Sequence, residues 1–317
     1  MSNPMNFGNN RICRMLGIDY PVLLGGMAHV SRFPLVAAVS EAGGLGIIGS
    51  GGMPPETLLE QIAQVRQATK KPFGVNLMLL DPNIDDQIEV VVNERVAMVS
   101  TGAGNPAKHI GRLKEAEIKV FAVVPSVALA RRMERAGADA VIAEGTESGG
   151  HVGEVTTFVL TPQVVDSVSI PVVAAGGIAD GRGLAAAFAL GAEGVQMGTR
   201  FLASAESPVH ENYKQQILKA NERATIVTGR SLRAPVRTIA NKMTKKFASY
   251  EAEERPREEF EELAVGGLQR AVYEGDTENG SLMAGQISGL IDKIEPVKAI
   301  IEKMVRSASK ILNKEAP

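Results

Sequence analysis

The chain has little of several residue types that would indicate particular classes of protein. Its 317 residues include one cysteine, no tryptophan and only 4% aromatic residues. A lone cysteine, Cys13, cannot form a disulfide within the chain, which is typical of a reducing compartment. So few aromatic side chains argue against the stacking surfaces that bind single-stranded nucleic acid. We therefore expect a cytoplasmic protein that does not bind nucleic acid.

Neither the charge nor the apolar runs point to a membrane or to a polyanion. The formal net charge is -2 at pH 7, so no overall field attracts nucleic acid or an anionic membrane surface. No apolar run approaches the ~20 residues that span a bilayer, and the N-terminus lacks a signal-peptide pattern. The 44% hydrophobic content suits a soluble α/β protein, either one large domain with an appendage or two domains.

Eight short apolar runs alternate with helical patterns in the first two thirds of the chain. Several runs are apolar on both faces, as expected for parallel strands covered by helices. Eight βα units in this span predict an α/β fold of the (β/α)8 TIM barrel type, with an open doubly wound sheet as the alternative. The runs are residues 22–25, 45–49, 73–79, 97–101, 120–124, 140–143, 171–175 and 194–198.

The pattern changes after residue 205. Residues 206–250 read as helical and basic, and residues 251–262 form a charge run that is typical of a solvated helix or linker. An amphipathic helix near residues 296–312 closes the chain. We expect residues 1–205 and 281–317 to form the barrel. Residues 206–280 are expected to form a small, mostly helical subdomain beside the barrel mouth.

The most informative segment is the glycine loop, residues 144–153, which reads Glu-Gly-Thr-Glu-Ser-Gly-Gly-His-Val-Gly after an apolar run. Its glycines allow sharp turns and a close approach to a flat ligand. Ligands of parallel α/β proteins bind at the carboxyl ends of the strands. A histidine there, His151, can exchange protons near neutral pH and is the candidate catalytic residue.

The carboxylates of the glycine loop, Glu144 and Glu147, admit two interpretations. Together with His151 they could be metal ligands. The sequence has no His-Glu-x-x-His or cysteine pattern, however, and carboxylates beside such a loop more often accept hydrogen bonds. We therefore predict no metal site.

Two further glycine segments follow the seventh and eighth predicted strands. Residues 174–181 read Ala-Ala-Gly-Gly-Ile-Ala-Asp-Gly, and residues 196–201 read Gln-Met-Gly-Thr-Arg-Phe. The loops after these strands often make a phosphate site in barrels. Gly176, Gly177 and Gly198 would allow the anion to approach, and the hydroxyl of Thr199 would donate to it. The alternative is that these glycines only make tight turns.

A flat ring could lie near the first and third strands. Gly26 and Met27 follow the first strand, and a backbone of this kind can lie against a ring. Asn76 falls inside an apolar run, where its amide must find a partner and could pair with a ring edge. Each feature also has a simpler interpretation, namely a turn and a polar residue within a strand.

Other features have weaker functional interpretations. The segment 44–49 matches the dinucleotide-binding G-x-G-x-x-G pattern, but it ends a helix and runs through a strand instead of following one. His29, His109 and His210 read as structural or surface residues. The cationic stretch, residues 230–246, has six cations and no carboxylate. It is either a solvated helix face or a dock for an anionic partner or a cofactor phosphate.

In the order in which they occur, these segments closely resemble the flavin-dependent enoyl-acyl-carrier-protein reductases of type II. That family lies within the wider 2-nitropropane dioxygenase, or nitronate monooxygenase, group. The likeness extends from about Ile18 to the C-terminal helix. The matching segments are 18–21, 25–28, 43–49, 72–80, 101–106, 123–130, 174–181, 198–201 and 281–286.

The resemblance implies a bound FMN and names its contacts. The phosphate would lie at Gly176, Gly177, Gly198 and Thr199. The ring would lie near Gly26, Met27 and Asn76, with Met283, Ala284 and Gln286 approaching from the C-terminal segment. Glu144 and Gly150 complete the expected cofactor site, and His151 matches the active-site histidine of the family. Nitronate monooxygenases usually have Gln at the start of the glycine loop, where this chain has Glu144.

The implied activity is the NAD(P)H-dependent reduction of trans-2-enoyl-acyl-carrier-protein through FMN, in fatty acid synthesis. One alternative is a nitronate monooxygenase in which His151 is the base and O2 the oxidant. The other is a barrel that binds a phosphate ligand without redox chemistry. The sequence leaves open NADPH versus NADH, acyl chain length, monovalent cation dependence and whether the chain forms a homodimer.

Overall fold

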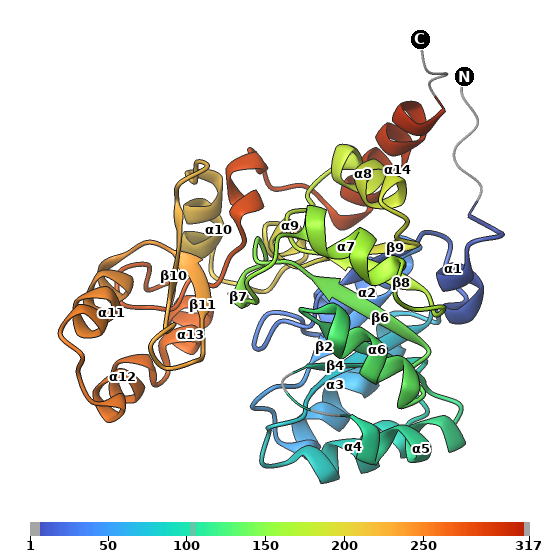
Figure 1. Ribbon diagram of the computed structural model, residues 1–317, viewed down its shortest axis with the longest axis horizontal. Coiled ribbons are helices and arrows are strands. Elements are labelled where there is room, and N and C mark those ends of the chain that lie inside the picture. Colours follow the sequence, from blue (N-terminus) through green and yellow to red (C-terminus); the bar gives the residue numbers. More distant parts are fainter. Residues whose placement is uncertain (1–6, 103, 105, 314–317) are drawn as a thin grey trace.

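Eight parallel strands close into a barrel whose outside is covered by helices (Figure 1). The computed structural model describes residues 7–102, 104 and 106–313. The strands neighbour one another in the order β1-β9-β8-β6-β5-β4-β3-β2, and a parallel bridge from Leu23 to Leu45 joins the two ends. The predicted TIM barrel is confirmed, and the open sheet is wrong. The strands are β1 (Val22–Leu24), β2 (Gly46–Gly49), β3 (Phe73–Met78), β4 (Met98–Gly102), β5 (Lys119–Val124), β6 (Ala140–Glu144), β8 (Val172–Ala175) and β9 (Gly194–Met197).

The barrel strands are short and apolar because both of their faces are covered. All residues of β1, β2, β8 and β9 are buried. Parallel strands between a packed interior and a layer of helices require such sequences. The 101–106 segment follows β4, and two of its residues, Ala103 and Asn105, lie outside the described residues.

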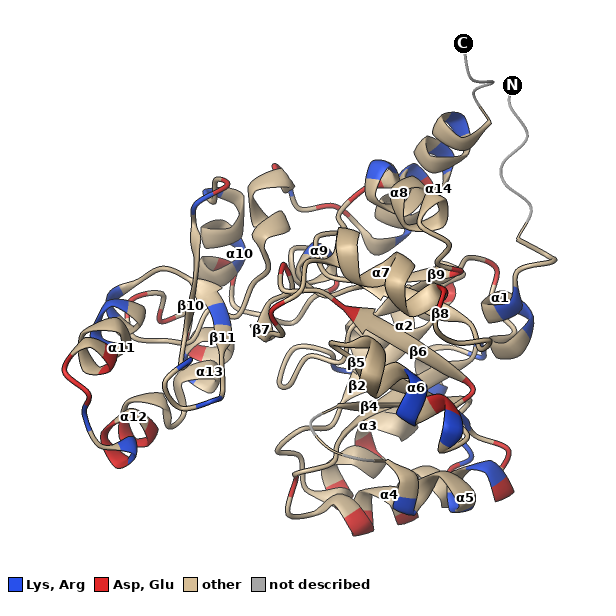
Figure 2. Cartoon of the chain, in the orientation of Figure 1, with Lys and Arg blue, Asp and Glu red and all other residues tan. Residues whose placement is uncertain are grey.

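The covering helices bury one face and expose the other. In α6, Ala130 and Met133 are buried, and the Ser126 hydroxyl caps the helix by accepting from the Leu129 N–H at 3.3 Å. The basic positions of α6 lie on the outside of the barrel (Figure 2). The covering helices are α2 (Phe33–Glu41), α3 (Pro55–Ala68), α4 (Ile84–Asn93), α5 (Ala107–Glu115), α6 (Val127–Arg135), α7 (Thr157–Val165) and α8 (Gly181–Ala189).

The G-x-G-x-x-G match at residues 44–49 has a packing role. Helix α2 ends at Glu41, and β2 begins at Gly46, so the pattern runs into a strand as predicted. A Cβ atom on Gly46 would lie 2.0 Å from the carbonyl oxygen of Val36 in α2. Only glycine allows this approach of strand to helix.

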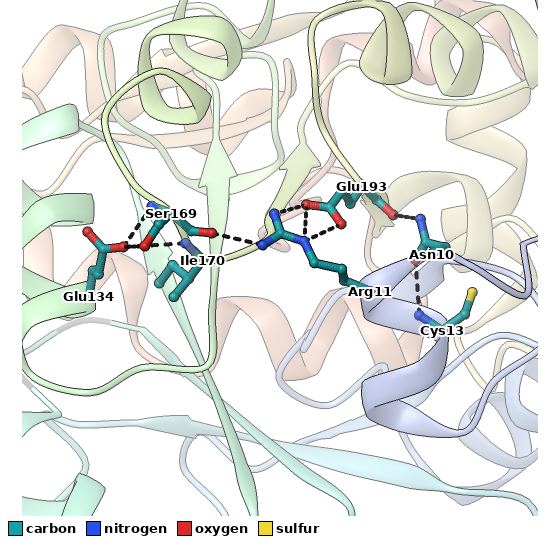
Figure 3. Close-up of polar contacts among 7 residues, drawn as sticks. All are labelled: Asn10, Arg11, Cys13, Glu134, Ser169, Ile170 and Glu193. Atoms are coloured by element: carbon teal, nitrogen blue, oxygen red, sulfur yellow. Dashed lines mark hydrogen bonds and ion pairs between the residues drawn. The ribbon is translucent and has the colours of Figure 1, made fainter.

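The amino ends of the strands are closed by helix α1 (Arg11–Leu16). The Arg11 guanidinium holds the Glu193 carboxylate just before β9, and it donates to the carbonyl of Ser169 at 2.8 Å (Figure 3). Asn10 donates to the carbonyl of Glu193 at 2.7 Å, and Glu134 accepts from the Ser169 N–H at 2.7 Å. These contacts cover the amino ends of β8 and β9.

The C-terminal helix α14 (Val297–Leu312) packs back onto the barrel, against α8 (Figure 1). The two helices approach closely at Gly181, where a Cβ atom would lie 2.5 Å from the carbonyl oxygen of Met304. No helix in the described part of the chain is both long and apolar enough to cross a membrane.

Residues 206–280, here called the outer segment, extend from one side of the barrel (Figure 1). Five helical pieces are present, but the prediction that residues 206–250 are helical is wrong for two runs of β-branched residues. These runs form the antiparallel strands β10 (Thr225–Thr228) and β11 (Val236–Ile239). The helical pieces are α10 (Glu211–Leu218), α11 (Lys242–Ala252), α12 (Arg257–Ala264), α13 (Gly267–Gln269) and η1 (Arg270–Glu274).

Candidate active site

A cavity of about 690 Å³ lies at the carboxyl ends of the barrel strands. Its volume falls within the ~300–1,000 Å³ that is typical of small-molecule sites. Its wall combines residues of β3 and the loops after β1, β2, β6, β8 and β9 with the outer segment and the C-terminal strap, residues 281–287. The predicted site residues that line it are Gly26, Met27, Asn76, Glu144, Gly150, His151, Gly176, Gly177, Gly198, Thr199 and Met283.

Two predicted site residues are not among the described residues that line the cavity. Ala284 is fully buried behind the glycine loop, where a Cβ atom on Gly149 would lie 2.7 Å from its Cα atom. Gln286 is exposed, and only its backbone N–H contacts the loop, donating to the carbonyl of Glu147 at 2.9 Å. These residues support the wall from behind.

The glycine loop ends in a strand that belongs to the outer segment. Strand β7 (Gly150–His151) pairs antiparallel with β11, with His151 opposite Val236 and Gly150 opposite Arg237. The N–H of Val152 donates to the carbonyl of Pro235 at 3.1 Å. His151 is exposed and lines the cavity. The outer segment therefore determines where the histidine lies.

Two glycines of this loop are required by its path. Gly150 has φ +77°, a left-handed conformation that costs other residues about 1 kcal/mol or more. A Cβ atom on Gly149 would lie 2.6 Å from the carbonyl carbon of Ala284. The loop thus passes directly beneath the C-terminal strap, and larger side chains would separate the two.

The carboxylate of Glu147 has a structural partner. It accepts from the N–H and the hydroxyl of Thr157, both at 2.9 Å. Thr157 begins α7, so the negative charge lies where the helix dipole is positive. Glu147 accepts hydrogen bonds, as the sequence predicted, and no cluster suited to a metal ion occurs among the described residues.

Unlike Glu147, which is bound to the start of α7, Glu144 lies at the end of β6, in the cavity wall. It accepts from the Ser148 hydroxyl at 3.2 Å. Burial raises the pKa of Glu144 to about 7, and the hydrogen bond from Ser148 opposes this shift. Glu144 can therefore gain or lose a proton near neutral pH, close to the loop that carries His151.

The predicted phosphate loops lie side by side because β8 and β9 are neighbours. Gly176 and Gly177 have φ of +94° and +70°, which explains the two glycines. The Thr199 hydroxyl oxygen accepts from the N–H of Gly285 at 2.9 Å. That bond ties the loop after β9 to the C-terminal strap and leaves the hydroxyl hydrogen for another partner.

In the wall formed by β1 and β3, Gly26 and Asn76 are packed together. A Cβ atom on Gly26 would lie 2.2 Å from the Cβ of Asn76, so glycine is required there. Asn76 is half-buried and donates from Nδ2 to the Ser100 hydroxyl at 3.0 Å, which gives its amide a partner. This bond fixes the amide plane of Asn76 in the cavity wall.

Several lining residues were not predicted as site residues, and Gln196, Tyr213 and Leu268 are examples. Gln196 of β9 is 8% exposed, and its Oε1 atom has no hydrogen-bond partner among the described residues. Gln196 is the first residue of the 196–201 segment, and its polar side chain within an apolar strand was a signal that could have identified it. Tyr213 and Leu268 come from the outer segment, where nothing in the sequence indicates that they reach the cavity.

The C-terminal strap is tied to both the barrel and the outer segment. The Tyr213 hydroxyl donates to the carbonyl of Met283 at 2.8 Å, and the N–H of Ile239 donates to the carbonyl of Leu282 at 2.9 Å. The strap runs into a short helix, η2 (Gln286–Leu290). This helix contacts α9 (Thr199–Leu202). Met283 is thereby held over the cavity.

The other histidines have local partners. His29 has φ +62°, and its Nδ1 atom lies 3.2 Å from the Tyr273 hydroxyl of η1. His210 accepts from the N–H of Asn212 at 3.1 Å and so caps α10. His109 of α5 has one Asp85 oxygen at 3.9 Å. Neither His109 nor His210 is among the described residues that line the cavity.

The cationic stretch is not one helix face, because residues 230–241 form a turn and a strand. Arg237 is buried and Arg230 forms an ion pair with Glu154. In the first turns of α11, Lys242, Lys245 and Lys246 are exposed, and Lys242 contacts Glu278 at 2.5 Å. The solvated-helix interpretation therefore applies only to these lysines.

Known proteins match this chain over almost its whole length. The family model described as nitronate monooxygenase matches residues 9–88 and 83–307. A probable nitronate monooxygenase of Staphylococcus saprophyticus is 36% identical over 354 residues, which cover 96% of this chain and 99% of that protein. A (3aS,4S,5R,7aS)-5-hydroxy-7a-methyl-1-oxo-octahydro-1H-indene-4-carboxyl-CoA dehydrogenase of Mycobacterium tuberculosis is 34% identical, covering 94% and 95%.

Among solved structures, FabK from Thermotoga maritima superimposes with a TM-score of 0.94 at 56% identity. The match covers 96% of this chain and 97% of FabK. Fold and sequence therefore indicate the same family. The chain belongs to the nitronate monooxygenase family, a family of FMN-dependent oxidoreductases.

Proposed function

We propose that this chain is an enoyl-acyl-carrier-protein reductase that uses FMN and NAD(P)H. The observation that carries the proposal is the 56% identity to FabK, an enoyl-acyl-carrier-protein reductase II, over nearly the whole of both chains. Identity to the probable nitronate monooxygenase of Staphylococcus saprophyticus is 36%.

The cavity residues fit FMN. Gly176, Gly177, Gly198 and Thr199 would hold its phosphate, and the left-handed conformations of Gly176 and Gly177 let backbone N–H groups approach an anion. Gly26, Met27 and Asn76 would lie against the ring. The Gln196 amide, whose buried Oε1 lacks a partner among the described residues, is available to a ring N–H. When bound, FMN would carry two electrons from a nicotinamide to the β-carbon of the enoyl thioester.

The side chains of the cavity would supply the proton that completes the reduction and would exclude water. A ring nitrogen of His151 would donate a proton toward the α-carbon while the thioester carbonyl gains negative charge. Glu144, whose pKa is raised to about 7 by burial, provides a second group that can carry a proton at the same wall. Met78, Leu268 and Met283 line the cavity with apolar surface that keeps water from the reacting carbons.

The acyl group would arrive on a carrier protein, and carriers of this pathway are acidic. The cations of α11, Lys242, Lys245 and Lys246, are the part of the cationic stretch that forms one exposed helix face. We infer that this face attracts the carrier. Attraction of this kind raises the association rate more than it changes the chemistry.

Nitronate oxidation is the second candidate function, favoured by the match to the nitronate monooxygenase model over most of the chain. In that reaction His151 would act as the base.

Steady-state oxidation of NAD(P)H with crotonyl thioester, with and without added FMN, tests the reductase directly. Mass spectrometry of the released cofactor should find FMN and not FAD, since residues 7–102 and 106–313 contain no Rossmann unit that could hold an adenylate.

A further inference from the structure

Arg237 of β11 is a buried cation held by the glycine loop. Its side chain is 7% exposed. The Nε atom donates to the carbonyl of Thr146 at 3.0 Å, and Nη1 donates to the Thr225 hydroxyl at 3.1 Å. Burial lowers the pKa of Arg237, while the carboxylate of Glu147 opposes that shift. The loop thus offsets part of the cost of burying the charge.

Arg237 contacts the glycine loop at both ends of the turn formed by residues 146–150. The backbone of Arg237 lies opposite Gly150 in the β7–β11 pair, and its side chain reaches back to Thr146. Both ends of the turn 146–150 are therefore fastened to a single residue. The next residue of the loop is His151.

We propose that Arg237 is a positioning residue for His151. Its guanidinium fastens the turn 146–150 to β11, and the fastened turn holds the imidazole at the cavity. The expected effect on catalysis rests on the proposed reductase function, but the effect on the loop does not. A displacement of about 1 Å at a reacting group can lower a rate by ~10²-fold.

The chain offers a matched control in the same hairpin. Arg233 lies in the turn between β10 and β11, and its side chain is exposed. Arg233→Met removes the same charge without touching the loop. Arg237→Met removes the guanidinium and keeps an unbranched apolar side chain. Arg237→Lys keeps the charge but loses the fork that reaches two acceptors at once.

The test is amide hydrogen exchange, followed by mass spectrometry, of the FMN-loaded protein and its variants. Arg237→Met should speed exchange in residues 146–152 by at least ~10-fold, with the barrel strands and α11 unchanged. Arg237→Lys should give an intermediate increase, and Arg233→Met should match the wild type. If Arg237→Met does not fold, the comparison of Arg237→Lys with Arg233→Met decides. Unchanged exchange in 146–152, or an equal increase throughout the outer segment, overturns the proposal.

Activity supplies the second readout. In Arg237→Met, oxidation of the reduced flavin by crotonyl thioester should slow by ~10–100-fold, while reduction by NAD(P)H keeps its wild-type rate. Equal slowing of both half-reactions contradicts a role through His151. A wild-type protein that fails to reduce enoyl thioesters removes the proposed function alone, since the exchange measurement still decides the role of Arg237.

Discussion

His151 and Val236 lie opposite each other in the antiparallel pair of β7 and β11, although they are far apart in the sequence. The loop that carries His151 therefore begins at a barrel strand, β6, and ends in the sheet of the outer segment. The position of the imidazole depends on both parts of the structure. This relationship makes the histidine and its supports the first targets for mutation.

The first prediction concerns His151→Ala. The variant should keep FMN, because the residues proposed to hold the phosphate lie in other loops and the change leaves Glu144 and Gly150 in place. Its reduced flavin should be reoxidised by crotonyl thioester ~10²–10⁴-fold more slowly, the usual value of general acid catalysis. Stopped-flow absorbance measures the two half-reactions separately, and His109→Ala, remote from the cavity, is the control. Reoxidation at the wild-type rate would exclude His151 as the acid.

The second prediction concerns stability and pH in the flavin-free protein. Burial raises the pKa of Glu144 from 4.5 to about 7, so the folded state keeps a proton that the unfolded state releases. The stabilisation is complete below about pH 4.5 and is lost as the pH rises to about 7. It amounts to about 3 kcal/mol at 1.36 kcal/mol per pH unit.

Glu144→Gln should remove this fall in the free energy of unfolding with rising pH. Urea unfolding at pH 5 and pH 8 gives the free energy of unfolding of each protein. We expect the wild type to lose about 2–3 kcal/mol more than the variant between these values. The exposed Glu154→Gln serves as the control. Parallel pH profiles for wild type and Glu144→Gln would contradict the raised pKa.

The barrel could be predicted because its strands carry a strong signal. Several are apolar on both faces, and helices such as α4, α5 and α6 bury one face, so the pattern in the sequence matches the burial. Strands β10 and β11 were missed because their sequences, Thr-Ile-Val-Thr and Val-Arg-Thr-Ile, mix polar with apolar residues and lie in an Arg-rich stretch. Their stability comes from pairing with each other and with β7, which local sequence does not reveal.

The site was predictable where backbone geometry demands glycine. Gly26, Gly150 and Gly176 lie at close approaches or in left-handed conformations. Side chains that arrive from distant segments were not predictable in the same way. Tyr213 reaches the cavity because α10 packs against the strap, and Gln286 faces outward because the short helix η2 begins there.

The third prediction concerns the bond between Thr199 and Gly285. Thr199→Val keeps the shape of the side chain but leaves the buried N–H of Gly285 without an acceptor. The free energy of unfolding should fall by ~1–3 kcal/mol. The dissociation constant for FMN, measured by quenching of flavin fluorescence, should rise. Thr199→Ser retains the hydroxyl and should behave as the wild type, whereas equal effects of both changes would contradict the role of the bond.

The fourth prediction concerns the carrier protein. Changing Lys242, Lys245 and Lys246 to Glu should raise KM for the carrier-bound substrate. KM for the crotonyl thioester of a small thiol should stay unchanged. Salt at ~0.15 M, where the screening length is ~8 Å, should remove much of the wild-type advantage. The same triple reversal on α6, at Arg131, Arg132 and Arg135, is the control. Equal effects on both substrates would point to a cofactor phosphate instead of the carrier.

The central claim is tested most directly by anaerobic reduction of the bound flavin. NAD(P)H should bleach the flavin absorbance rapidly, and crotonyl thioester should then restore it without oxygen. Bleaching by a nitronate but not by NAD(P)H would contradict the reductase and support the monooxygenase.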